Sequence, residues 1–364
     1  MRQLIVAGLI ASAMVTGAGV CQADERGPSE SAGVEQFAVL PDGVRFPEGI
    51  TANPATGEIY VGTFDFGPNA NKLLRFGKNG RLIAQRDFGK APLLGLGFDA
   101  AHSKVFILNV GAIAGAGASK VQRIAAAFDN TTAVEDVAPI PVIGAPIPRT
   151  VGNPDGSSDV ITFGSSGVPV PNGMVFDHLG NLYVSDSFQG AIFRIDNAKT
   201  CATPCAVTLV SHDPLLATAG FPPFGANGLA LNAAETALFI ANTGDNRVLK
   251  MDIATKAVSV FAESVHGADG LLFDASGRLW VAANQADQIV ALNDKARPVA
   301  RVGEFEGIHR DGTPQGLLFP ASMVIVGEHM YVTNLALPLT PAVGDEPEED
   351  VTRWTIARFT VPNR

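Results

Sequence analysis

A short motif occurs six times along this chain of 364 residues, and the repetition strongly constrains the fold. Each copy opens an apolar strand, and a turn rich in Asp, Asn and Gly then leads to a second strand rich in Val, Ile, Tyr, Phe and Trp. The copies are EGITAN at 48–53, LGLGFD at 94–99, NGMVFD at 172–177, NGLALN at 227–232, DGLLFD at 269–274 and the looser ASMVIV at 321–326. The motif starts lie 42 to 78 residues apart. Antiparallel repeats at such intervals are typical of propeller blades. The sequence therefore predicts an all-β, six-bladed β-propeller with four-stranded antiparallel blades.

The two ends of the chain are expected to close this ring. Residues 34–40 form a predicted strand that belongs to no repeat, and residues 354–361 supply a late strand for the sixth blade. Pairing the two segments would remove two exposed sheet edges. We therefore expect residues 24–364 to form a single propeller domain. A closed ring of this kind is expected to be a monomer.

The N-terminal residues have the pattern of a secretory signal peptide rather than of the fold. Arg2 precedes an uncharged apolar run over residues 4–20, and small residues end the segment at Ala23. This pattern predicts a signal peptide over residues 1–23, and hence an exported protein, periplasmic or secreted, that leaves the membrane after cleavage. An uncleaved anchor is the alternative, although the run is short for a membrane span.

Cysteine usage and charge narrow the class further. Once the signal peptide is removed, only Cys201 and Cys205 remain, and an exported protein favours a local disulfide between them. This segment has too few other sulfur or histidine ligands for zinc. The formal net charge of −10 argues against a nucleic-acid partner, which needs a basic surface. A small-molecule substrate is the expected partner.

The first residues of the six motifs should converge at the propeller axis, because the first strand of each blade lines the central channel. Four of them carry side-chain oxygens: Glu48, Asn172, Asn227 and Asp269. Two carboxylates and two amides suit one divalent cation, most readily Ca²⁺, whereas the absence of His and Cys disfavours zinc and copper. The alternative is that Asn-Gly and Asp-Gly simply mark turns. However, these pairs open apolar strands in one common register.

Other polar and aromatic residues are expected near the same face. The second strands end at Thr63, Asn109, Asp186, Asn242, Asn284 and Asn334, which either orient ligands or cap turns. Phe46, Phe221 and Phe224 precede site strands and could line an apolar pocket or pack between blades. His266 is a candidate for proton transfer, whereas His102, His178 and His329 belong to the opposite face. The acidic run over residues 345–350 is interpreted as a solvated loop.

With these residues, the chain resembles the SMP-30/gluconolactonase/LRE family of six-bladed propellers, which is related to the diisopropylfluorophosphatases and paraoxonases. The resemblance extends from about residue 40 to the C-terminus and is strongest over 172–284. It implies that Glu48, Asn172, Asn227 and Asp269 hold the axial cation, because they match the family pattern in order and blade number. It further implies lactone or ester hydrolysis, with the metal polarising the carbonyl. Asp269 would act as general base or nucleophile, and Asn172 would hold substrate or metal.

The chain also departs from this family pattern. The segment VPVP at 168–171 stands where sugar-lactone members carry an Arg, and the paraoxonase histidine pair has no counterpart near Leu94. The sequence therefore favours a hydrophobic lactone or ester over a sugar acid. Two other functions remain open. NHL-type propellers share the style of GNLYVSD at 180–186 and act as binding platforms, and strictosidine-synthase-like propellers are metal-free enzymes.

Overall fold

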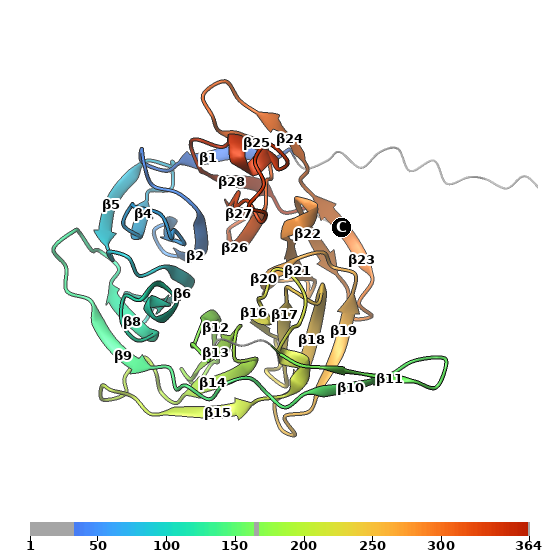
Figure 1. Ribbon diagram of the computed structural model, residues 1–364. Coiled ribbons are helices and arrows are strands. Elements are labelled where there is room, and N and C mark those ends of the chain that lie inside the picture. The colour runs from blue at the N-terminus through green and yellow to red at the C-terminus, as the bar shows by residue number, and fades with distance from the viewer. Residues whose placement is uncertain (1–32, 164–166, 363–364) are drawn as a thin grey trace, which may run out of the picture. The chain divides into compact units, whose positions relative to one another are not determined.

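Six four-stranded antiparallel sheets are arranged in a ring in the computed structural model, which describes residues 33–163 and 167–362 (Figure 1). The predicted six-bladed β-propeller is thereby confirmed. The predicted signal peptide over residues 1–23 lies outside the described residues. No helix in the described part of the chain is long and apolar enough to cross a membrane.

The first five blades follow one another along the chain, and within each blade the strands are ordered from the axis to the rim. Blade one contains β2 (Pro47–Asn53), β3 (Glu58–Thr63), β4 (Lys72–Phe76) and β5 (Leu82–Asp87). Blade two contains β6 (Leu93–Asp99), β7 (Lys104–Asn109), β8 (Lys120–Ala125) and β9 (Glu135–Pro139). Blade three contains β12 (Pro171–Phe176), β13 (Leu182–Asp186), β14 (Ala191–Ile195) and β15 (Val207–Ser211). Blade four contains β16 (Ala226–Leu231), β17 (Ala237–Asn242), β18 (Arg247–Asp252) and β19 (Val258–Glu263). Blade five contains β20 (Ala268–Phe273), β21 (Leu279–Ala283), β22 (Gln288–Leu292) and β23 (Pro298–Val302).

The sixth blade joins the two ends of the chain, as the sequence predicts. Its strands are β26 (Pro320–Val326), β27 (His329–Asn334), β28 (Thr355–Thr360) and, at the rim, β1 (Glu35–Val39). Phe37 of β1 packs edge-on against Tyr331 with ring centroids 4.8 Å apart, and Glu35 pairs with Arg358. The ring therefore closes through side-chain packing as well as through strand pairing.

The second and fourth strands of each blade end at the face where the inner strand begins, because the strands are antiparallel. We call this the upper face and the opposite one the lower face. The longer connections follow these two strands, so most of the irregular chain lies on the upper face. Its connections carry two hairpins and four short 3₁₀ helices: β10 (Arg149–Gly152) with β11 (Ser158–Ile161), β24 (Phe305–Ile308) with β25 (Pro314–Gly316), η1 (Gly111–Ala114), η2 (Pro214–Leu216), η3 (Asn284–Ala286) and η4 (Pro347–Asp350). The β10–β11 hairpin belongs to the long segment of chain that connects blade two to blade three, and it extends past the rim of the ring (Figure 1).

Every inner strand carries a β-bulge at its motif start. In β12, for example, Pro171 pairs with Asp186 and Met174 pairs with Val184, so the two intervening residues oppose a single residue of β13. The same irregularity occurs in β2, β6, β16, β20 and β26. A bulge re-aims the side chains beside it. This explains why one residue per blade can leave the strand pattern and join an axial ring.

A glycine follows the motif start in five of the six motifs, and close packing, not a turn, requires it; in the sixth motif Ser322 stands there. A Cβ atom on Gly173 would lie 2.3 Å from the carbonyl oxygen of Asn227, and one on Gly228 would lie 2.2 Å from that of Asp269. The same contact joins blades one to two, two to three and five to six. Neither glycine has a positive φ. The interpretation of these Asn-Gly and Asp-Gly pairs as turns is therefore ruled out.

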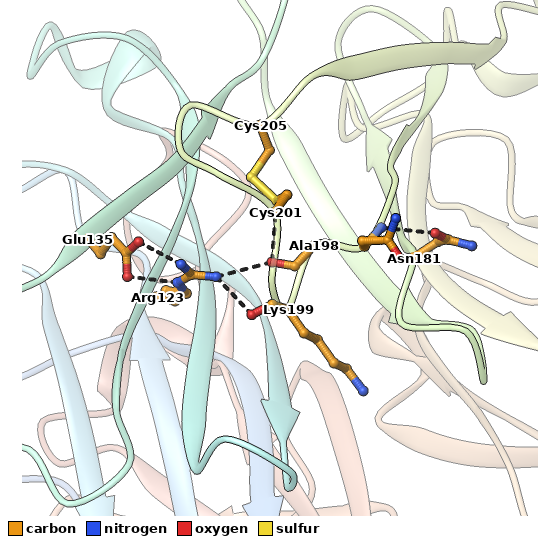
Figure 2. The surroundings of a disulfide bond; sticks show 8 residues. Arg123, Glu135, Asn181, Ala198, Lys199, Cys201 and Cys205 are labelled. Atoms are coloured by element: carbon orange, nitrogen blue, oxygen red, sulfur yellow. Dashed lines mark hydrogen bonds and ion pairs between the residues drawn. A yellow bond between two sulfur atoms is a disulfide. The ribbon is translucent and has the colours of Figure 1, made fainter.

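The disulfide lies on the lower face, in the connection from β14 to β15 (Figure 2). Cys201 and Cys205 are joined, with their Cα atoms 5.8 Å apart. The Cys205 N–H donates to Val137 O in blade two, and the Arg123 guanidinium of that blade donates to the carbonyls of Ala198 and Lys199. The bridged loop of blade three is thus attached to the outer strands of blade two.

Candidate functional site

The four predicted ligands line one cavity at the upper end of the axis. Glu48, Asn172, Asn227 and Asp269 are each the second residue of an inner strand, and each is at most 5% exposed. The cavity has a volume of about 40 Å³. This is enough room for an ion together with one or two waters. The structure therefore brings together, from four blades, the residues that the motif repeat singles out.

Two carboxylate oxygens in this cavity are buried and have no hydrogen-bond partner among the described residues. They are Glu48 Oε2 and Asp269 Oδ1. An unpaired polar atom in the interior is costly, and a buried carboxylate is costlier still unless a cation or a donor meets it. No Lys, Arg or His of the described chain lines the cavity. The donor set therefore fits a hard, oxygen-preferring cation of the calcium type.

The electrostatics of the pair are consistent with such a site. Burial raises the pKa of Glu48 well above its usual range, and the nearby Asp269 carboxylate raises this pKa further. Burial also raises the pKa of Asp269 to about 7, although hydrogen bonds from Asn284 and Asn227 oppose the shift. Two neighbouring acids in a dry site cannot both ionise cheaply. Either a proton or a cation must therefore neutralise part of the charge.

The two amide ligands are each held by a hydroxyl of the same blade. Asn172 Nδ2 donates to Ser187 Oγ at 3.0 Å, and Asn227 Nδ2 donates to Thr243 Oγ1 at 2.9 Å. Each amide thus turns its nitrogen toward the hydroxyl and its carbonyl oxygen away from it. Carbonyl oxygens are suitable ligands for calcium.

Of the six residues predicted to end the second strands, one belongs to the site, and it lies one residue beyond its strand, because β21 ends at Ala283. Asn284 lines the cavity, and its Nδ2 donates to Asp269 Oδ2 at 3.0 Å. The other five accept backbone N–H groups in turns and connections: Thr63, Asn109, Asp186, Asn242 and Asn334. Turn capping therefore describes five members of that ring, and ligand orientation describes one.

The remaining walls of the cavity are apolar. They are formed by Phe64, Leu94, Pro222, Phe224, Phe319, Leu335, Leu337 and Leu339, with Thr243 as the additional polar member. Phe64 and Leu335 directly follow the ends of β3 and β27, the position that Ser187 and Thr243 hold in their blades. This position, one residue beyond the predicted second ring, is the signal that could have identified them.

Of the four predicted pocket residues, the structure brings only Phe224 to the cavity. Phe46 packs edge-on against Trp354, with ring centroids 4.9 Å apart, and belongs to the cores around blades six and one. Phe221 is 60% exposed, and His266 is exposed in its loop. The expectation that these three line the pocket is corrected. Proximity in sequence to a site strand did not place their side chains, because Phe46 packs into the neighbouring core and the upper loops leave Phe221 and His266 exposed.

The acidic run helps to shape one wall of the cavity. Asp345, Glu346 and Glu349 lie close together on the upper face. Glu346 Oε2 accepts the N–H groups of Leu339 and Thr340, and Glu349 accepts that of Gly344. These carboxylates therefore fold the loop that carries Leu339 to the site.

A second cavity, of about 420 Å³, occupies the lower part of the channel between the inner strands. Asn172 and Asn227 contribute to both cavities, whereas the wall of the lower one includes Met174, Leu271 and Met323. None of the described residues lining this lower cavity is charged. The acid–base chemistry of the axis is therefore confined to its upper end.

Comparison with known proteins supports the fold assignment. The chain is similar to the calcium-binding protein regucalcin from Agrobacterium tumefaciens (TM-score 0.59, 16% identity, 92% of this chain and 96% of that one). It is also similar to a gluconolactonase from Xanthomonas campestris (TM-score 0.54, 12% identity, 90% and 89%) and to virginiamycin B lyase from Staphylococcus aureus (TM-score 0.53, 14% identity, 90% and 99%). No protein-family model and no curated protein matches the sequence.

These similarities confirm the expected resemblance to the SMP-30/gluconolactonase/LRE propellers at the level of the fold. One fold can carry different reactions, and the proteins just named include both a gluconolactonase and a lyase. The activity of this chain must therefore be argued from its own site.

Proposed function

We propose that this chain is an exported, metal-dependent hydrolase of a lactone or related ester. One divalent cation, most readily Ca²⁺, would be held by Glu48, Asn172, Asn227 and Asp269. The observation that carries the proposal is the pair of buried carboxylate oxygens without partners, which share a cavity with two hydroxyl-held amides. The similarity in fold to regucalcin and to a gluconolactonase supports the same choice.

Asp269 and Asn284 would have distinct roles in ester hydrolysis. A bound cation would polarise the ester carbonyl and stabilise the negative charge that develops on its oxygen. Asp269 Oδ1 would serve as the cation ligand, and the same carboxylate, which Asn284 orients through Oδ2, would accept a proton from water or attack the carbonyl carbon. Burial raises the pKa of Asp269 to about 7 in the metal-free site. A bound cation would lower this pKa and keep the carboxylate ionised, as a general base must be.

The substrate class follows from the walls. The apolar walls of the cavity, such as Phe64, Phe224 and Leu339, cannot hydrogen-bond to sugar hydroxyls. Because the cavity itself has room only for an ion and one or two waters, a lactone would have to reach the oxygens between these side chains. Apolar walls exclude water and favour an apolar acyl or alkyl group. We therefore propose a hydrophobic lactone or ester as the substrate, and not a sugar-acid lactone.

The first experiment is calorimetric titration of Ca²⁺ into the chain beginning at Asp24, after treatment with a chelator. We expect one tight site in the unchanged protein and its loss in Asp269→Ala. Aliphatic lactones and gluconolactone would then be compared as substrates, with faster turnover expected for the former. Absence of binding in both proteins would contradict the hydrolase and favour a metal-free propeller, either a binding platform or a metal-free enzyme. Export is tested separately, because the exported protein should begin at Asp24.

A further inference from the structure

Two buried hydroxyls occupy equivalent places beside the ring of ligands. Ser187 follows the last residue of β13, Thr243 follows the last residue of β17, and both are 2% exposed. Each accepts the amide N–H of the motif-start asparagine in its own blade, Asn172 or Asn227. The same hydrogen bond, from a ligand amide to a buried hydroxyl, therefore occurs in blades three and four.

The single proton of each hydroxyl is directed to the neighbouring blade. Ser187 Oγ donates to Ala226 O at 2.8 Å, and Thr243 Oγ1 donates to Ala268 O at 2.7 Å. Because a hydroxyl has only one proton, this bond leaves it only an acceptor role toward the asparagine. The asparagine must then present its NH₂ group to the hydroxyl and keep its carbonyl oxygen on the other side.

The carbonyl that each hydroxyl meets lies directly before the next ligand. Ala226 precedes Asn227, and Ala268 precedes Asp269, so each hydroxyl contacts the side chain of one ligand and the carbonyl of the residue before the next ligand. A chain of contacts thus runs from Asn172 through blade four to Asp269. Partners that orient ligands in this way usually affect metal affinity strongly.

We propose that Ser187 and Thr243 are positioning residues of the axial cation site. They fix the amide orientation of Asn172 and Asn227, so that each carbonyl oxygen stays available to a cation. This inference rests on the proposed function, because it assumes that the asparagine carbonyls bind a cation. It assigns to two residues outside the ligand set a role in the affinity for that cation.

Ser185 offers a matched control in the same strand. It is fully buried, and its Oγ donates to Asn227 O at 2.6 Å, so it also joins blade three to the main chain of blade four. Its other partners are the N–H and carbonyl of Gly173, and it contacts no asparagine amide. Ser185→Ala therefore removes an inter-blade hydroxyl without freeing a ligand amide.

The test compares Ca²⁺ affinity by calorimetry and unfolding temperature in chelator for Ser187→Ala, Thr243→Val, Thr243→Ser and Ser185→Ala. We expect Ser187→Ala and Thr243→Val each to lose about 10-fold or more in affinity. Thr243→Ser should restore the affinity, and Ser185→Ala should lower the unfolding temperature while leaving affinity unchanged. The two serine variants test the inference independently of those at Thr243, should one position fail to fold.

Two outcomes would overturn the inference while leaving the proposed function intact. Unchanged affinity in Ser187→Ala and Thr243→Val would show that the amides need no hydroxyl. An equal loss of affinity in Ser185→Ala would show that inter-blade packing in general, and not amide orientation, controls the site. If the unchanged protein binds no Ca²⁺, the proposed function and this inference fail together.

Discussion

Glu48 and Asp269 meet in a cavity that no basic side chain of the described residues lines, and each leaves one oxygen without a partner. A salt bridge within the protein cannot offset the cost of burying these two oxygens, because none of the described lining residues is Lys, Arg or His. A cation from solution can relieve it, and the two asparagine carbonyls complete a hard donor set. At the residue scale, the chemistry of the site therefore follows from unpaired oxygens and not from an unusual residue type.

Replacing Asp269 by Asn tests the charge of the site while keeping its shape. We expect Asp269→Asn to lose about 10-fold or more in Ca²⁺ affinity, because the site loses one of its two carboxylates. Calorimetry after chelator treatment measures the loss. Asp274→Asn is the matched control, since Asp274 lies at the other end of the same blade strand and pairs with Arg278. Equal affinity in Asp269→Asn and the unchanged protein would remove Asp269 from the ligand set.

The pH dependence of stability provides a second test at this scale. In the metal-free protein the pKa of Asp269 is raised to about 7, so the folded state binds a proton that the unfolded state has already lost. This stabilisation is present at low pH and is lost as the pH rises from about 4 through about 7. We expect the unfolding temperature in chelator to fall over that window and Ca²⁺ to reverse the fall.

A control is needed for this pH test because burial also raises the pKa of Glu348 to about 7 and that of Glu48 well above its usual range. Asp269→Asn lacks the contribution of Asp269 while keeping Glu348 and the burial of Glu48. Its unfolding temperature in chelator should therefore change less with pH than that of the unchanged protein. Identical pH profiles for the two proteins would mean that Asp269 does not titrate in this window.

The sequence predicted the residues that the repeat itself positions, and it was less informative about the others. Glu48 and Asp269 occupy the same position of the motif in blades one and five, so the motif predicted that their side chains converge. By its spacing Asn284 falls among the five turn-capping residues, but β21 ends at Ala283. Asn284 therefore holds the position of Ser187 and Thr243, and it contacts Asp269. Phe319 and Leu339 come from connections that have no period, so their approach to the cavity depends on tertiary packing.

At the scale of strands, the β-bulge and the glycine within it determine how the inner strands pack around the axis. The bulge turns one side chain toward the cavity, and the glycine lets the next inner strand approach to contact. The motif starts therefore predicted the six inner strands well. The β10–β11 hairpin lies outside the motif repeat, and its two strands, RTVG and SDVI, lack the alternation of apolar and polar residues that marks a strand in a sequence.

The glycine contact can be tested by adding one methyl group. We expect Gly173→Ala to destabilise the protein by about 3 kcal/mol, because its Cβ would overlap the carbonyl oxygen of Asn227 and push two inner strands apart. Denaturant midpoints measure the change. Gly152→Ala in the β10–β11 hairpin is the control, since its Cβ would meet nothing within 4 Å. Equal midpoints for the two variants would contradict the packing role of the motif glycine.

At the scale of the whole ring, β1 completes the sixth blade from the other end of the sequence. Without it, the edge of β28 would expose unpaired backbone groups, and Phe37 would no longer cover Tyr331. Exposed edges of this kind promote association between chains. The outer strand of one blade therefore affects the solubility of the entire propeller.

A shortened chain tests this closure. We expect a chain beginning at Pro41 to unfold at a lower temperature and to aggregate, compared with one beginning at Asp24. Differential scanning fluorimetry and size-exclusion chromatography measure the two effects. Addition of a peptide covering residues 33–40 should partly restore the unfolding temperature, because it can pair with β28. A shortened chain that remained monomeric and equally stable would show that closure contributes little.

Between five of the six neighbouring pairs of inner strands, the spacing contact joins a glycine to a main-chain carbonyl, so it does not depend on which side chain precedes that glycine. Leu94 and Ala321 occupy two of the six axial places without any donor oxygen, and their blades are as regular as the others. Inherited changes at these six places can therefore alter reactivity without rebuilding the scaffold. The same independence makes Leu94 and Ala321 natural starting points for an engineer who wishes to give this axis a different chemistry.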